Sequence, residues 1–297
     1  MPKTKASPRR IYIMTDLEGI ANVDTMDHMD KETQPYRDAC HELMRDTNAA
    51  IAGAFDGGAT EVVVRDGHTG GGNFIDGMLD ERATQDRRRI AEFFRSTRKK
   101  FEAVFFVGCH AMAGTLNGFL DHTQNSRQWF EYRLNGRPTG EIGMIAAAAG
   151  AFDLPLTLVT GDEAACQEAR AFVGNLETAA VKQGVGRNRA RLYDADDARR
   201  RIREAACRAL RLSEAVRPFK DLTLQRGKMV IEARPGGHDK GTAITAFARE
   251  APFSGRVCVF AGDDVTDEAG FKAVNAMGGM TIKIGEGESA ARFRAAN

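Results

Sequence analysis

Short β-rich segments alternate with longer helical segments along most of this sequence, and this alternation constrains the fold more than any other feature. The expected strands cover 11–14, 61–64, 103–107 and 156–159. The expected helices cover 36–55, 87–100, 141–149, 163–173 and 195–212. Because strands separated by helices of this length pair in parallel, the sequence predicts an α/β fold, a mostly parallel sheet flanked by helices.

The pattern starts again after the segment Arg217-Pro218-Phe219-Lys220. The expected strands beyond it cover 228–233, 257–260 and 280–284, and the expected helices cover 241–249 and 268–276. We therefore expect a basic tail over 1–10, a larger domain over 11–220 and a smaller α/β part over 221–297. A chain of 297 residues is long enough for such an arrangement.

Composition excludes several classes of protein. The formal net charge is +1, so no overall charge attracts nucleic acid or a membrane surface. No segment reaches the roughly 18 apolar residues of a membrane helix, and no apolar signal segment is visible. The five cysteines are scattered without a Cys-x-x-Cys pair, which argues against a disulfide framework or a cysteine zinc site. We expect a cytoplasmic protein without nucleic-acid or membrane partners.

Metal-competent side chains follow three of the expected strands. Asp16 and Glu18 come after the first strand, His68 after the second and His110 after the third. Because the carboxyl ends of parallel strands meet at one edge of a sheet, these side chains should lie together. Mixed carboxylate and imidazole ligands favour zinc or another first-row metal, and such a set can hold two ions roughly 3.5–4 Å apart.

Ordinary structural roles stand beside this interpretation. A single histidine after a strand is often a hydrogen-bonded loop residue, and Asp16 and Glu18 can cap a following helix. Their combination, with glycines beside each group, favours the site. The pattern alone leaves two further residues open. His122 lies in a loop and can act as a general acid or base, whereas Glu141 opens a helix, where the dipole already favours a carboxylate.

Several segments, in this order along the chain, resemble the D-aminopeptidase family of zinc peptidases. They are YIMTDLEGI (12–20), DGH (66–68), FVGCHAMAGT (106–115), HT (122–123), LNG (134–136), GEIG (140–143), VTGDEAAC (159–166) and VKQGVGR (181–187). The resemblance extends from about residue 10 to about residue 220. So many motifs in register make it specific.

The resemblance implies a dizinc aminopeptidase that acts on short peptides with an N-terminal D-amino acid. The metal ligands that it implies are Asp16, Glu18, His68, His110 and Glu141. It places the catalytic histidine at His122, and Asp66 is expected to orient one of the ligands. It also implies a homo-oligomer, a decameric ring of two stacked pentamers whose inner chamber admits small peptides.

The last part of the chain resembles a different family. The segments GKMVIE (227–232), GHDKG (237–241) and FAGDDVTDE (260–268) resemble the carboxy-terminal part of trehalose-6-phosphate phosphatases, of the haloacid dehalogenase superfamily. The adjacent acids Asp263 and Asp264 fit magnesium, and Lys240 would steady a phosphoryl group. That superfamily also uses a nucleophilic aspartate in an Asp-x-Asp-Gly motif, which Asp16-Leu17-Glu18-Gly19 approaches.

Three functional interpretations follow. A magnesium phosphohydrolase with Asp16 as nucleophile is disfavoured, because residues 60–190 follow the peptidase and show no phosphatase cap. A non-catalytic binding module is disfavoured too, because all five ligand positions hold competent residues. The simplest interpretation is a metal peptidase fused near residue 221 to a phosphatase fragment that has no nucleophile and no activity of its own. Such a join would leave normally covered apolar surface exposed.

Overall fold

The computed structural model describes residues 9–88, 101–129, 131–212, 222–227, 230–235 and 239–296. The chain separates into two compact units, of which unit 1 comprises Met1–Arg127 and Thr139–Lys220, and unit 2 comprises Gln128–Pro138 and Asp221–Asn297. Unit 2 thus includes a short hairpin from inside the expected 11–220 domain. At the other end, Arg10 begins the first strand instead of closing a tail.

A seven-stranded sheet forms the centre of unit 1, in the order β3-β2-β1-β4-β7-β8-β9. Its strands are β1 (Arg10–Thr15), β2 (Glu61–Asp66), β3 (Ala83–Gln85), β4 (Ala103–Cys109), β7 (Leu156–Asp162), β8 (Glu177–Gly186) and β9 (Arg189–Leu192). Neighbouring strands are parallel except for β8 and β9. The prediction of a mostly parallel sheet is confirmed.

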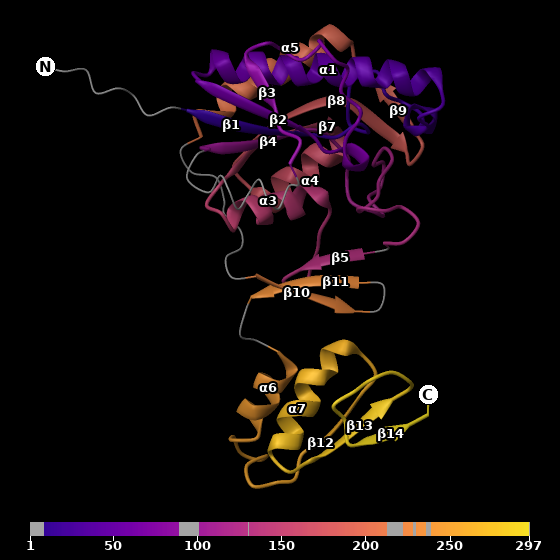
Figure 1. Ribbon diagram of the computed structural model, residues 1–297, viewed down its shortest axis with the longest axis vertical. Helices are drawn as coiled ribbons and strands as arrows, with labels where there is room; N and C mark the ends of the chain where they lie inside the picture. Colours follow the sequence, from indigo (N-terminus) through magenta and orange to yellow (C-terminus); the bar gives the residue numbers. More distant parts are fainter. Residues whose placement is uncertain are drawn as a thin grey trace, which may run out of the picture. The chain divides into compact units, whose positions relative to one another are not determined.

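Helices cover both faces of this sheet (Figure 1). One face carries α1 (Gln34–Asp56) and α5 (Ala195–Ala209), and the other carries α3 (Glu141–Gly150) and α4 (Glu163–Val173). The main apolar cluster lies on the α1 and α5 face, where Ile13 and Val64 are fully buried. Since strand side chains alternate between faces, the residues next to them, Met14 and Arg65, belong to the α3 face. Most of the helix expected over 87–100 lies outside the described residues.

The order of the strands shows that the chain changes its direction of travel across the sheet next to β1. The chain runs from β1 outward to β2 and β3, and then returns to β4 on the other side of β1. Ligands of open α/β sheets bind beyond the carboxyl ends of the strands at such a reversal. The backbone of β4 and the backbone that follows β1 approach each other closely at this edge. Gly108 has a φ of 79°, and a Cβ at this position would lie 2.3 Å from the carbonyl oxygen of Asp16.

Unit 2 contains two small sheets. The first has the order β10-β11-β5-β6, with β10 (Leu222–Gly227), β11 (Val230–Pro235), β5 (Glu131–Leu134) and β6 (Arg137–Pro138). The parallel pairing of β5 with β11 is why the hairpin groups with unit 2. The second sheet is parallel and has β12 (Val259–Gly262), β13 (Met280–Ile284) and β14 (Phe293–Ala295), with helices α6 (Lys240–Phe247) and α7 (Glu268–Ala276). No helix within the described ranges is long and apolar enough to cross a membrane.

Candidate metal centre

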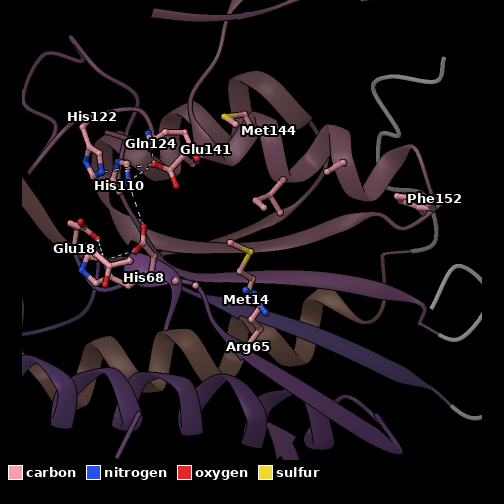
Figure 2. Close-up of a pocket in the computed structure, with 16 residues that line it drawn as sticks. Met14, Glu18, Arg65, His68, His110, His122, Gln124, Glu141, Met144 and Phe152 are labelled. Carbon is pink, nitrogen blue, oxygen red and sulfur yellow. Dashed lines mark hydrogen bonds and ion pairs between the residues drawn. The ribbon is translucent and has the colours of Figure 1, made fainter. Parts of the chain in front are cut away.

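The candidate site residues converge at the carboxyl edge of the unit 1 sheet (Figure 2). Asp16 and Glu18 follow β1, while His68 follows β2 and His110 follows β4, the strands on either side of β1. Glu141 is the first residue of α3. His122 completes the set from the loop after β4, and all six residues line one cavity of about 630 Å³.

Asp16, Glu18 and His68 form the first of two groups of metal-competent side chains. The Nδ1 atom of His68 lies 3.0 Å from Asp16 Oδ1 and 3.1 Å from Glu18 Oε2. The three residues are only 6%, 5% and 7% exposed. Apart from its ion-pair contact with His68 Nδ1, Glu18 Oε2 is buried without a hydrogen-bond partner, so it can take a further ligand. Buried carboxylates need a compensating positive charge, which a metal ion supplies.

His110, His122 and Glu141 form the second group. His110 Nε2 lies 3.3 Å from Glu141 Oε1, and the rings of His110 and His122 stack with their centroids 3.8 Å apart. Asp16 connects the two groups, because its Oδ2 atom lies 3.5 Å from His110 Nε2. One carboxylate that presents an oxygen to each group suits a pair of ions, and the mixed donor set fits zinc.

Backbone carbonyls orient two of the imidazole rings. His110 Nδ1 lies 2.9 Å from the carbonyl oxygen of Ala111, and His122 Nδ1 lies 2.8 Å from that of Leu120. These contacts assign the Nδ1 proton as the donor to each carbonyl. Burial lowers the pKa of His110, but Glu141 and Asp16 outweigh it and raise that pKa well above its ordinary value, so Nε2 of His110 must lose a proton before it binds a metal. The Nε2 atom of His122 is left as an acceptor.

Burial and mutual charge shift the pKa values within the site. Burial, followed by the charge of Glu18, raises the pKa of Asp16 to about 7. Burial lowers the pKa of His68, but Glu18 and Asp16 outweigh it and raise that pKa to about 10. Burial and the neighbouring His110 both lower the pKa of His122. His122 therefore favours its neutral form, in which it can accept a proton.

Buried and half-buried carboxylates hold the loop that carries His110 and His122. Glu168, Asp162 and Asp121 each accept a hydrogen bond from a backbone N–H of this loop, at 2.7, 2.8 and 2.6 Å respectively. Sequence reasoning did not single out these acids. Nothing in the local pattern distinguishes an acid that binds a distant backbone amide from an acid on the surface.

Lys182 of β8 holds the loop after β1 in the same way. Its side chain is fully buried, and Nζ donates to the carbonyl oxygens of Glu18, Ile20 and Val23 at 2.5, 2.8 and 2.6 Å. The ammonium group also lies 4.5 Å from the centroid of the Phe119 ring. Burial lowers the pKa of Lys182 to about 7. Three hydrogen bonds from its Nζ atom fix the backbone that presents Asp16 and Glu18.

Asp66 supports the site through a neighbour instead of orienting a ligand ring. Its carboxylate accepts hydrogen bonds from the backbone N–H and the side-chain amide of Asn73, at 2.6 and 2.8 Å. The same Asn73 amide donates to the carbonyl oxygen of His68 at 2.8 Å. Asp66 and Asn73 therefore set the backbone at His68, and Asn73 is a residue that the sequence analysis missed.

The residues suggested for magnesium lie in unit 2. Asp263 and Asp264 follow β12, and neither joins a group of metal-competent side chains within the described ranges. The carboxylate of Asp264 caps the short 3-10 helix Val265–Asp267. Lys240 Nζ lies 2.5 Å from Asp267 Oδ1 and is paired with that acid.

Comparison with known proteins separates the two parts of the chain. The D-aminopeptidase family model matches residues 9–232, and the trehalose-phosphatase model matches residues 192–297. The D-aminopeptidase of Bacillus subtilis (strain 168) is 30% identical over 214 residues, which cover 71% of this chain and 77% of that protein. The Zn-dependent D-aminopeptidase DppA from Bacillus subtilis, described as a self-compartmentalizing protease, superposes with a TM-score of 0.68 and 27% identity, covering 82% of this chain and 86% of that chain.

The similarity to phosphatases is high but short. The trehalose-6-phosphate phosphatase of Escherichia coli (strain K12) is 56% identical over 75 residues, which are 25% of this chain and 28% of that protein. Because the trehalose-phosphatase model matches residues 192–297, it does not include Asp16 and gives no support to Asp16 as a phosphatase nucleophile. The peptidase match covers more than half of the chain and contains all six candidate site residues. The chain belongs to the D-aminopeptidase family and is a metal-dependent peptidase.

Proposed function

We propose that this protein is a zinc aminopeptidase that hydrolyses short peptides with an N-terminal D-amino acid. One observation carries the proposal: Asp16 presents one oxygen to His68 and the other to His110, within a cavity lined by two further carboxylates. Two zinc ions would share Asp16. Glu18 and His68 would complete the ligands of the first ion, and His110 and Glu141 those of the second.

Side chains of the protein would carry out the proton transfers of the reaction. Zinc, when bound, polarises the scissile carbonyl and lowers the pKa of a water molecule that it holds towards about 7. His122 has its Nε2 atom 3.9 Å from Glu141 Oε1 and its Nδ1 atom engaged by a backbone carbonyl. We assign it to accept a proton during attack and return it to the leaving amine, because its lowered pKa favours the neutral ring.

Release of D-alanine from D-Ala-D-Ala tests this function. The purified full chain is assayed as prepared, after chelation and after zinc is restored, with L-Ala-L-Ala as the stereochemical control. We expect release that chelation abolishes and zinc restores, and we expect Asp16→Asn to bind less zinc and to lose the activity. Folded, zinc-loaded protein that releases no amino acid from either dipeptide would contradict the proposal.

We propose that residues 221–297 are a phosphatase-derived part fused to the peptidase domain over 11–220, and that they have no phosphatase activity. The segment that the phosphatase model matches contains Asp263, Asp264 and Lys240 but no Asp-x-Asp-Gly motif, which supports this proposal. Phosphate release from trehalose 6-phosphate with magnesium is the direct assay. Release that Asp263→Asn abolishes would show that the part is active and would restore magnesium at Asp263 and Asp264 as a cofactor.

We also propose that the chain forms a cytoplasmic homo-oligomer, a decameric ring. The support is the similarity to a structure described as a self-compartmentalizing protease. Light scattering coupled to size-exclusion chromatography measures the assembled mass. A monomer at micromolar concentration would contradict the ring.

A further inference from the structure

Arg65 brings a permanent positive charge to the cavity that contains the metal ligands. Among the described residues that line this cavity, it is the one lysine or arginine. Arg65 is half-buried on β2, where its Cα pairs with that of Met14 on β1. Figure 2 shows the Arg65 side chain beside Met14, along the sheet from His68.

The Arg65 guanidinium has no hydrogen-bond or ion-pair partner within the described ranges of the chain. A second hollow adjoins it and is lined by three acids, Asp66, Asp76 and Asp86; none of them forms an ion pair with Arg65 within the described residues, and two are engaged by other groups. Asp66 accepts hydrogen bonds from Asn73, and Asp86 Oδ1 lies 2.8 Å from Arg88 Nε. Asp86 lies within electrostatic range of Arg65 but is paired with Arg88, so the half-buried guanidinium can bind a further anion from solution.

The strand register sets the separation between Arg65 and the metal ligands. Met14 and Arg65 are paired neighbours on the same sheet face, and Asp16 lies two residues beyond Met14 on that face. Two residues of strand span about 6.6 Å. In a dipeptide with its peptide bond at the ligands, the one residue after that bond spans roughly 3.3–3.6 Å, about half of this separation. The long Arg65 side chain would have to cover the rest to reach the carboxylate.

The wall of the cavity between the metal ligands and Arg65 is apolar. Met144, Ile145 and Ala148 of α3, together with Phe152, line the cavity opposite the sheet. Met14 lines it from β1. Apolar walls with a few polar groups at the ends are typical of small-ligand sites, in which the polar groups set the orientation. This wall suits the hydrocarbon side chains of a short peptide.

We infer that Arg65 binds the C-terminal carboxylate of the substrate and makes the enzyme prefer short peptides with a free carboxylate. The inference rests on the proposed peptidase function. A guanidinium and a carboxylate form two parallel charge-assisted hydrogen bonds. Amidated peptides lack the negative charge that this contact needs.

The test compares D-Ala-D-Ala with D-Ala-D-alaninamide, using the zinc-loaded full chain. We expect the wild type to prefer the free acid by about 10–100-fold in kcat/KM, the range of one charge-assisted contact. Arg65→Met should remove most of this ratio, chiefly through a higher KM for the acid. Arg65→Lys should keep part of it, because lysine retains the charge but loses the paired geometry.

The matched control is Arg87→Met, which removes an exposed arginine that does not line the metal cavity. It should keep the wild-type ratio. An acid-to-amide ratio that is unchanged in both Arg65→Met and Arg65→Lys would overturn the inference while the peptidase function stands. If the folded, zinc-loaded wild type cleaves neither substrate, the proposed function itself fails, and the assignment of Arg65 as its carboxylate anchor fails with it.

Discussion

At the scale of single residues, two stacked imidazoles have different positions relative to the carboxylates. His110 Nε2 lies within 3.5 Å of both Glu141 and Asp16, whereas His122 Nε2 is 3.9 Å from Glu141. Replacing His122 should therefore spare the ligand set. For His122→Ala we expect turnover to fall by about 10²–10⁴-fold, the usual contribution of a general acid or base.

Zinc content by mass spectrometry is measured on the same His122→Ala samples, with Asp16→Asn as the variant that should lose metal. Replacing a residue that transfers protons leaves metal binding intact, so His122→Ala should keep its zinc. If turnover and zinc content fall together, His122 is a ligand and its catalytic assignment is wrong.

Protonation of His68 should couple zinc binding to pH. Burial lowers the pKa of His68, but Glu18 and Asp16 raise it to about 10, so protein stripped of metal carries this proton at neutral pH. Because an imidazole must lose its proton to bind a metal, zinc binding should release protons and strengthen as the pH rises from about 6 to about 8. Titration calorimetry in two buffers of different ionisation enthalpy measures the release. A binding enthalpy that does not depend on the buffer would contradict this coupling.

At the scale of elements, β8 supports a loop that belongs to β1. Lys182→Met would remove three hydrogen bonds and leave the carbonyl oxygens of Glu18, Ile20 and Val23 without this donor. We expect the free energy of unfolding to fall by about 2–4 kcal/mol and the zinc affinity to fall with it. Lys31→Met, at an exposed lysine, is the matched control. Denaturant unfolding and zinc titration measure the two quantities. If Lys182→Met and Lys31→Met give the same free energy of unfolding and the same zinc affinity, the Lys182 contact has no effect.

At the scale of the whole molecule, unit 2 exposes apolar side chains near an open strand edge. Within the described ranges β12 pairs with β13 alone, and Val257 and Val259 are 78% and 64% exposed. Exposed apolar edges promote association between chains. The double variant Val257→Lys, Val259→Lys should weaken any association that grows with concentration, as measured by sedimentation velocity. Val185→Lys, at a valine of unit 1 that is 53% exposed, should not. Equal effects of the two changes would exclude β12 as the cause.

The quality of the sequence-based predictions differs between elements for a physical reason. Helix α4 and strand β13 have the expected bounds, because apolar periodicity and capping residues are local signals. Strand β8 was not expected, because the glycines at 184 and 186 and the buried Lys182 interrupt its apolar alternation. The hairpin of β5 and β6 is short, and its pairing with β11 joins segments about a hundred residues apart along the sequence.

The sequence by itself determined that Asp16, Glu18, His68 and His110 follow strands, and parallel pairing then brings them to one edge. Local patterns suffice for that, since strand direction and strand ends are encoded within a few residues. Only the tertiary structure decided that Asp16 faces both groups, that Arg65 lines the same cavity, and that Lys182 holds a backbone 164 residues away along the chain. Those arrangements depend on side-chain direction and on contacts between distant segments, which no local pattern records.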